Sequence, residues 1–239
     1  MSGGVGPTYN DITLPKEEEE HQTQTSTVSP TGKPAGFFSF RQLNILAIII
    51  VLSASGLVTI QDFIFTILTL IYFFLSKLIF PPHNNPNRDA PLTSSTNKIF
   101  RIYVTAAGIV GLIIPIGYIF EGIVEDDKNG VSAAAPHVFL LASQIFMEGL
   151  ATMFGFSAPA RILVPIVYNA RRVLTLVEWI MSEFSREDVT GTVSARRMYA
   201  GKVLAAVNLG IWSFNLFGVL IPVYLPRAFK RYYGSDKED

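Results

Sequence analysis

Long runs of apolar residues, almost free of charge, alternate with short polar breaks along this chain. The longest runs cover residues 43–60, 102–120, 138–156 and 203–225. A helix of about 20 apolar residues is long enough to cross the hydrocarbon core of a bilayer. The pattern therefore predicts an all-α integral membrane protein rather than a soluble domain.

The polar breaks predict about five transmembrane helices within a membrane domain of residues 37–226. We expect these helices near residues 38–55, 63–80, 100–120, 136–156 and 203–225. The link between the first two is so short that they form an antiparallel hairpin. Proline and asparagine residues between 81 and 91 mark a loop, and Pro115 is expected to kink the third helix.

Residues 159–184 have a different pattern, in which apolar and polar positions each repeat with helical spacing. Arg171, Arg172 and Glu178 lie within this stretch and make it a poor transmembrane segment. We therefore expect an amphipathic helix that lies in the cytosolic interface of the membrane. Trp179 would anchor its apolar side.

The remaining segments are polar. Residues 1–36 are rich in Gly, Pro, Ser, Thr and Gln and predict a disordered cytosolic tail, and residues 227–239 form a short C-terminal tail. Most of the 19 lysines and arginines fall on the side that holds the N-terminus, so the positive-inside rule puts that side in the cytosol. Five crossings put the C-terminal tail on the opposite side. If the last segment turns back at Pro222, or residues 162–181 cross as well, that tail is cytosolic.

Composition narrows the possible functions. Only 16% of the residues are charged, against about 25% in a typical soluble domain. The formal net charge is zero, which argues against a nucleic-acid-binding protein. The absence of cysteine excludes disulfides, thiolate metal sites and cysteine nucleophiles, and the three histidines have no metal-ligand spacing.

Catalytic motifs are also missing from the sequence. It contains no phosphate-binding loop, nucleophile elbow or dinucleotide fingerprint, so we expect a non-enzymatic protein without a cofactor or bound metal ion. The acidic residues 125–127 lack the spacing of a calcium-binding loop and predict a solvated loop.

Glu148 is the strongest candidate for a functional residue, because it lies near the middle of the fourth predicted helix. An ionisable group at that depth is costly and is by default a functional hypothesis. His137 and Gln144 lie on the same helical face, and Asn208 and Asn215 lie at similar depths on the last predicted helix. These five residues predict a polar seam between two helices. The seam can hold the helices together, carry ions or protons, or place a catalytic acid.

Basic residues gather in and after the predicted interfacial helix. They are Arg161, Arg171, Arg172, Arg196, Arg197 and Lys202. Each can gain about 1 kcal/mol beside anionic lipid, so we expect them to contact lipid headgroups. A positively charged loop also orients the neighbouring helices, so membrane topology is the alternative explanation.

Three sequence blocks carry a resemblance to a known kind of protein. They read FFSFRQLNILAIIIVLSASGLV, YNARRVLTLVEWI and ARRMYAGKVLAAVNLGIWSFNLFGVLIPVYLPRAFKRYYG. They resemble an uncharacterised family of plant multi-pass membrane proteins over residues 37–234, and that family brings no activity with it. The layout of hairpin, basic stretch and basic tail is also similar to that of small ER and nuclear-envelope proteins that work with membrane-shaping partners.

Together these features favour a non-enzymatic protein of an endomembrane, with the ER as the expected compartment. We expect a scaffold or membrane-organising factor whose partners are anionic lipids and other membrane proteins or a second copy of the chain. The small residues Ala107 and Gly111 predict a close helix contact, either within the chain or between two copies. The alternative is a small oligomeric ion or proton channel or transporter that uses Glu148. No nucleic-acid partner is expected.

Overall fold

The computed structural model describes residues 44–46, 48–49, 52–53, 56–82, 98–186 and 193–234, which all belong to the compact unit Phe38–Asp239. The predicted tail 1–36, most of the predicted helix 38–55 and the end of the tail 227–239 lie outside the described residues. Within the described ranges every regular element is a helix and no strand occurs. The all-α prediction is confirmed for this part of the chain.

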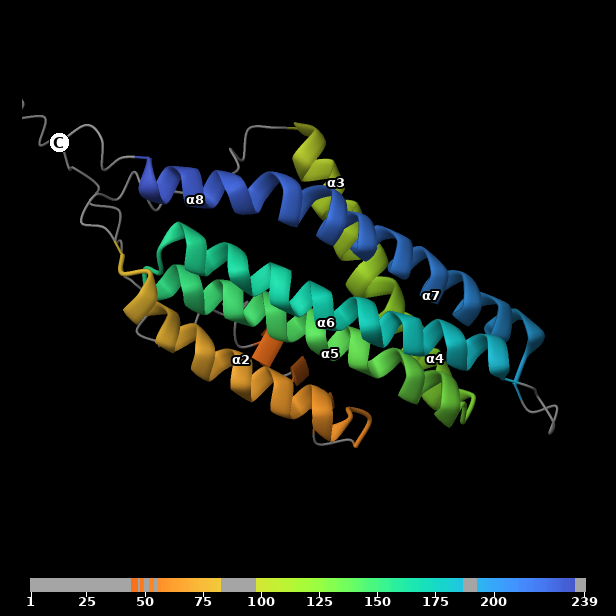
Figure 1. The fold of residues 1–239 in the computed structure, drawn as a ribbon. Coiled ribbons are helices and arrows are strands. Elements are labelled where there is room, and N and C mark those ends of the chain that lie inside the picture. The colour runs from red at the N-terminus through yellow and green to blue at the C-terminus, as the bar shows by residue number, and fades with distance from the viewer. Residues whose placement is uncertain are drawn as a thin grey trace, which may run out of the picture. The chain divides into compact units, whose positions relative to one another are not determined.

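The helical elements follow one another in the order shown in Figure 1. They are α2 (Ile60–Ile79), α3 (Lys98–Gly108), η1 (Ile109–Ile113), α4 (Ile114–Val124), α5 (Lys128–Met153), α6 (Ala158–Ser185), α7 (Ala195–Phe214), η2 (Asn215–Tyr224) and α8 (Leu225–Tyr233). Among the described residues, four stretches are long and apolar enough to cross a membrane: Ile60–Ile79, Ile102–Val124, Lys128–Met153 and Ala195–Tyr233. These stretches overlap the second, third, fourth and last of the predicted membrane helices.

Polar caps decide where three of these helices begin. The caps are Thr59 before α2, Asp127 before α5 and Ser194 before α7. Each side-chain oxygen accepts a hydrogen bond from the backbone N–H three residues later, which satisfies one of the donors that a helix start leaves unpaired. Because Asp127 caps α5, this helix starts well before the expected residue 136 and contains Pro136 in its interior.

α5 is the central helix, and α6 lies antiparallel against it (Figure 1). At one end, Arg186 at the C-terminus of α6 forms an ion pair with Asp127 at the N-terminus of α5. At the other end, α6 begins after only a short turn from the end of α5. α6 therefore lies alongside α5 from one end to the other. Tyr168, Leu176 and Trp179 of α6 are fully buried.

The structure does not confirm a helix that lies flat in the membrane interface at residues 159–184. α6 packs against α5, α7 and α2 instead. Arg171 pairs with Asp62 of α2, and Arg172 donates a hydrogen bond to Gln144 of α5. Asp62 thus compensates the charge of Arg171, and Arg172 has a hydrogen-bond acceptor within the protein.

Helix ends that are far apart in the sequence meet at the other end of α5. The hydroxyl of Ser157, just before α6, donates to the carbonyl oxygen of Phe80 after α2 at 2.9 Å. The hydroxyl of Tyr232 of α8 donates to the carbonyl oxygen of Pro81 at 3.1 Å. We call this end of the helices the Phe80 end and the opposite end the Asp127 end. The five-crossing prediction expects the loop after residue 81 and the C-terminal tail on opposite sides of the membrane, whereas Pro81 and Tyr232 are in contact here; the number of crossings stays a prediction.

Apolar side chains are divided between the interior and the outer surface. α5 supplies much of the core, with Val138, Phe139 and Leu140 fully buried. α2 in contrast exposes large apolar side chains such as Leu68 and Leu75. An apolar surface of this kind is unfavourable in water and is solvated by lipid chains, so the described helices are compatible with a membrane-embedded protein.

α3, η1 and α4 form one continuous helical rod that contacts α7 through a glycine. Gly111 of η1 lies against the indole of Trp212, where a Cβ atom would be 2.6 Å from Cζ2. Only glycine permits this approach of the backbone to the ring. Gly117 of α4, on the same rod, has no neighbouring atom within 4 Å of its Cβ position.

We predict opposite effects for alanine at these two glycines. Gly111→Ala forces the rod away from Trp212 and lowers stability by about 1–3 kcal/mol, the usual cost of overpacking. Gly117→Ala raises stability by about 0.4–1 kcal/mol, because it restricts the unfolded chain without a clash. Thermal unfolding of the detergent-solubilised protein measures both variants, and equal shifts of the two midpoints would contradict the packing described.

Candidate functional site

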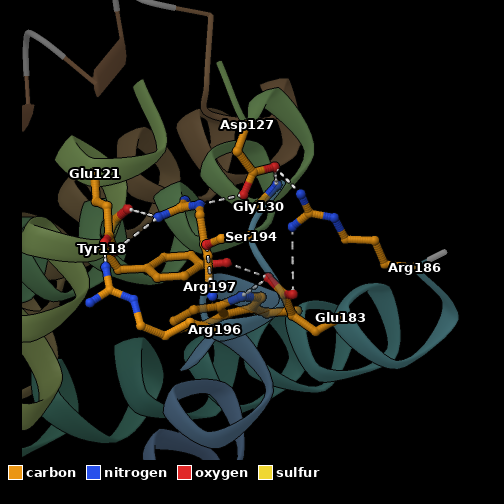
Figure 2. A network of polar contacts seen from close by, with 10 residues as sticks. Tyr118, Glu121, Asp127, Gly130, Glu183, Arg186, Ser194, Arg196 and Arg197 are labelled. Atoms are coloured by element: carbon orange, nitrogen blue, oxygen red, sulfur yellow. Dashed lines mark hydrogen bonds and ion pairs between the residues drawn. The ribbon is translucent and has the colours of Figure 1, made fainter. Parts of the chain in front are cut away.

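Asp127 lies at the centre of a buried polar network that joins four helices (Figure 2). Its carboxylate is 1% exposed. One oxygen accepts a hydrogen bond from Nε of Arg197 at 2.7 Å. The other accepts from the backbone N–H of Gly130 at 3.0 Å and from the guanidinium of Arg186. The negative charge is thus compensated by two arginines that flank the segment between α6 and α7.

Arg197 connects Asp127 to the end of α4. The cap at Ser194 fixes the first turn of α7, and Arg197 lies in that turn with its side chain fully buried. Nη1 donates to the carbonyl oxygen of Tyr118 at 2.9 Å and lies 3.4 Å from a carboxylate oxygen of Glu121. The guanidinium also lies 4.1 Å from the centre of the Tyr118 ring, in cation–π geometry.

Glu183 extends the network along α6. Its Oε1 accepts hydrogen bonds from the hydroxyl of Tyr118 at 2.9 Å and from Nε1 of Trp179 at 3.2 Å. Its other oxygen lies 3.7 Å from Nη1 of Arg186. Arg186 therefore stands between two buried carboxylates, Glu183 and Asp127, and every charge in the group has an opposite partner.

Three glycines provide the space that the network occupies. Gly122, Gly130 and Gly201 lie on α4, α5 and α7, and a Cβ atom at any of them would collide with polar atoms of the network. At Gly122 the space is taken by the guanidinium of Arg197. The glycines let charged groups approach helix backbones closely, so they belong to the same structural feature as the charges.

The network also changes the protonation of Asp127. Burial acts to raise the pKa of its carboxyl group, but the hydrogen bonds from Gly130, Arg186 and Arg197 outweigh burial and hold the pKa below its ordinary value. Asp127 and the carboxylate of Glu183 correspondingly hold the pKa of Arg186 above its ordinary value, against the effect of burial. The pair is therefore held in its charged form.

A second group of polar residues compensates for hydrogen bonds that Pro115 cannot donate. Pro115 has no backbone N–H, so carbonyl groups one turn earlier lose a helical partner. Nε2 of His137 donates to the carbonyl oxygen of Gly111 at 2.8 Å. Nδ2 of Asn208 donates to the carbonyl oxygen of Val110 at 3.2 Å. Two residues of the predicted seam thus satisfy the backbone of the neighbouring rod.

Gln144 connects Glu148 to a buried arginine. Its amide nitrogen donates to Oε1 of Glu148 at 2.7 Å, and its amide oxygen accepts from the guanidinium of Arg172. Arg172 is fully buried, and its guanidinium lies 4.2 Å from the centre of the Trp212 ring. One polarised amide therefore lies between a positive and a negative charge inside the protein.

Asn215, the last residue of the predicted seam, accepts a hydrogen bond from the hydroxyl of Tyr103 at 3.0 Å. The structure thus brings Gln144 and Glu148 together and directs His137, Asn208 and Asn215 to the α3–η1 rod. The functional role of Glu148 stays a prediction.

The sequence of this chain matches a protein family. Residues 38–233 match the family described as a domain of unknown function, DUF7733. The chain belongs to this family. No curated protein and no solved structure matches the chain. The whole network around Asp127 lies inside the DUF7733 domain, and membership by itself assigns no activity.

The basic residues of the DUF7733 domain are used differently from the prediction. Arg172 and Arg197 are fully buried, which contradicts the headgroup contact predicted for them. Arg171 donates to Asp62 at 2.8 Å, and the exposed Arg196 donates to Glu121 at 2.6 Å. The ammonium of Lys202 lies 5.4 Å from the centre of the Phe184 ring. Arg161 lies in the first turn of α6. The two corrections have one cause, because buried acceptors replace the headgroups.

Sequence reasoning missed Asp127, which was expected in a solvated loop. The available signal was local: Asp127 stands three residues before Gly130 at the start of a helix, which is the spacing of a cap. Its arginine partners could not be found in this way, because they are 59 and 70 residues away.

In the described part of the DUF7733 domain, no group of three or more histidine or acidic residues could hold a metal ion.

We predict that Asp127 makes stability depend on acid pH. Because its folded pKa lies below the unfolded value of about 3.9, its contribution is present above that pH and is lost as pH falls through the folded pKa. Asp127→Asn leaves buried arginines without their charge partner and costs about 3–5 kcal/mol at neutral pH. The variant also has a flatter loss of thermal stability between about pH 5 and pH 3 than the unmodified protein.

The neighbouring Asp126 provides a matched control. Its side chain is 83% exposed and pairs only loosely with the exposed Lys128, so Asp126→Asn should change stability by less than about 1 kcal/mol. Unfolding midpoints of both variants, measured across the pH series in one detergent, decide the matter. Indistinguishable profiles of thermal stability against pH for Asp127→Asn and Asp126→Asn would contradict the role of the network.

Proposed function

We propose that this DUF7733 protein is a non-enzymatic multi-pass protein of an endomembrane that acts as a scaffold or membrane-organising factor. The observation that most supports this proposal is that charged side chains inside the protein are paired with one another. Asp127 binds Arg186 and Arg197, and Asp62 binds Arg171. Charges that compensate each other in this way stabilise one arrangement of helices and are not poised for chemistry on a substrate.

The Phe80 end supplies a surface suited to such a role. α8 combines exposed Arg227, Lys230 and Arg231 with the aromatic side chains of Phe229 and Tyr233. Basic and aromatic residues together are typical of helices that contact the membrane interface. The resemblance in layout to small ER proteins favours the ER as the compartment, and this surface is the part we propose for contact with lipids or partner proteins.

We further propose that α6 crosses the membrane between α5 and α7. Its 28 residues extend about 42 Å, more than the roughly 30 Å of a hydrocarbon core. Its two ends lie beside the two ends of α5, and Asp62 and Gln144 compensate its central arginines. With this crossing counted, residues 80–82 and the end of α8 share a side, in agreement with the bond from Tyr232 to Pro81. The positive-inside rule then favours a cytosolic Phe80 end, with both chain termini on that side.

One observation keeps the transport alternative in view. Glu148 is partly exposed, and Gln144 donates to its carboxylate. A carboxylate at this depth can bind a cation or carry a proton if several copies of the chain enclose a path. This alternative and the scaffold proposal differ in what Glu148 does, so experiment can separate them.

We predict that a proximity-labelling enzyme fused to the C-terminus enriches membrane-shaping or trafficking proteins in cells. Substituting Arg227, Lys230 and Arg231 by glutamine removes the basic surface of α8 and should reduce that enrichment to background, because the interface contact is electrostatic. A protein set made up only of bulk membrane neighbours, unchanged by the substitutions, contradicts the scaffold proposal.

A flux measurement tests the alternative. The scaffold proposal predicts that proteoliposomes with the purified protein conduct protons and monovalent cations no faster than empty vesicles. If Glu148 lines a path, flux is present, is lost in Glu148→Gln and persists in Glu178→Gln, whose side chain is exposed on α6. That pattern would overturn the scaffold proposal.

The proposed crossing of α6 can be tested with cysteine labelling, because the chain has no cysteine of its own. We predict that Met153→Cys and Ala195→Cys, both exposed, react with an impermeant maleimide from opposite sides of a sealed membrane. Asn129→Cys is the control and should label from the same side as Ala195→Cys, since both lie at the Asp127 end. An interfacial α6 gives the contrary result, with positions 153 and 195 labelled from one side and position 129 from the other.

A further inference from the structure

α2 and α6 enclose an apolar groove of about 420 Å³ on the outer surface. Its walls include Leu68 and Phe73 from α2 and Val164 and Val167 from α6. The volume lies within the range of small-molecule sites, and the lining is almost entirely hydrocarbon. A groove of this composition suits a flexible apolar ligand better than a polar one.

Two contacts between the helices mark the ends of the groove. At the Phe80 end, Ser157 donates to the carbonyl oxygen of Phe80 at 2.9 Å. At the other end, the rings of Phe65 and Tyr168 meet edge to face with their centres 5.4 Å apart. From Phe65 to Ser76 the α2 wall is about 16 Å long, at 1.5 Å per residue. This length is close to half of a bilayer core of about 30 Å, which is one leaflet.

Lys77 places a positive charge beside the Phe80 end of the groove, whereas the charge of Arg171, beyond the other end, is compensated by Asp62. Lys77 directly follows Ser76, the last groove residue of α2, and its ammonium lies 4.4 Å from the centre of the Phe156 ring. α8 reaches the same end, because the ring of Phe229 contacts that of Phe80 with centres 5.8 Å apart. α8 also carries the exposed side chains of Arg227 and Lys230. Apolar walls with cationic side chains at one end match a lipid with an anionic headgroup.

We propose that the α2–α6 groove binds one acyl chain of an anionic glycerophospholipid, with the phosphate beside Lys77 and the basic side chains of α8. The chain lies against Leu68, Phe73 and Val164 and ends where Phe65 meets Tyr168. This inference rests on the proposed function only in requiring that α2 and α6 cross the membrane. It moves the specific lipid contact from the arginines of α6 to the Phe80 end.

The test uses the full-length protein reconstituted in vesicles of phosphatidylcholine and phosphatidylglycerol in equal amounts. In one preparation the phosphatidylglycerol carries a photoreactive diazirine on its acyl chain, and in the other the phosphatidylcholine does. After irradiation, mass spectrometry locates the cross-linked peptides. Two variants of α2 are compared: Thr69→Trp fills the groove, and Ile67→Trp places the same ring on the exposed outer face of the helix.

We expect phosphatidylglycerol to cross-link residues 65–76 and 160–167 at least about fivefold more than phosphatidylcholine does. That ratio corresponds to about 1 kcal/mol, the contribution of one basic residue beside anionic lipid. Thr69→Trp should remove these cross-links and Ile67→Trp should preserve them. The double variant Arg227→Gln, Lys230→Gln should keep groove labelling but reduce the preference for phosphatidylglycerol.

Several results would overturn the proposal. They are equal labelling of the groove and the outer face of α2, equal labelling by the two lipids, and insensitivity to Thr69→Trp. Groove labelling that occurs in vesicles but is absent in native membranes would also overturn it, because another protein segment would then cover the groove. Failure of the scaffold role alone leaves the cross-links in place, whereas failure of membrane insertion removes cross-links from every helix, so the two outcomes are distinguishable.

Discussion

The compensation of Asp127 by two arginines is the interaction on which the arrangement of the other helices depends. Arg186 ends α6, Arg197 begins α7, and Asp127 caps α5, so one carboxylate holds three helix ends at the same point. Arg197 adds α4 through the carbonyl oxygen of Tyr118. An apolar interface between helices leaves sliding and rotation open, whereas buried charges that must meet specify one register.

The two ends of the protein use charge in different ways. At the Asp127 end the arginines Arg186 and Arg197 are paired with carboxylates, so their charges act within the chain (Figure 2). At the Phe80 end the helices are joined by hydrogen bonds to backbone carbonyl groups, from Ser157 to Phe80 and from Lys77 to Phe154, and the basic side chains of α8 are exposed. One end held by paired charges and one end with exposed basic and aromatic side chains fit the proposed role of a scaffold that contacts lipids or partner proteins at one membrane face.

Hydropathy predicted the all-helical class and the positions of four apolar membrane helices, because lipid exposure demands long runs without charge. It predicted an interfacial helix at residues 159–184, which the structure does not confirm, and it judged the cost of each arginine without knowing its partner. Arg171 meets Asp62 across 109 positions of sequence, and Arg172 meets Gln144 across 28. Pairings over such distances are set by the packing of helices and leave no periodic signal in a single sequence.

Local chemistry was visible in the sequence where both partners share a helix or a turn. Gln144 and Glu148 are four residues apart, so the bond between them follows from helical spacing alone. Pro115 was visible in the sequence as well, but not the side chains that satisfy the carbonyl groups before it, because His137 and Asn208 come from two other helices. Their polarity predicted a seam that could hold helices together, carry ions or protons, or place a catalytic acid, and in the structure both side chains donate to backbone carbonyl groups.

The most direct test of the central claim is a double-mutant cycle between Asp127 and Arg197, read as the free energy of unfolding in mixed detergent micelles. If the pair holds α5 to α7, Asp127→Asn and Arg197→Gln together destabilise less than the sum of the single changes, with a coupling of about 1–3 kcal/mol. Replacing Asp127→Asn by Asp126→Asn in the cycle should abolish the coupling, because that carboxylate is exposed. Additivity of Asp127→Asn and Arg197→Gln within about 0.5 kcal/mol would show that the two residues are not coupled and would contradict the account.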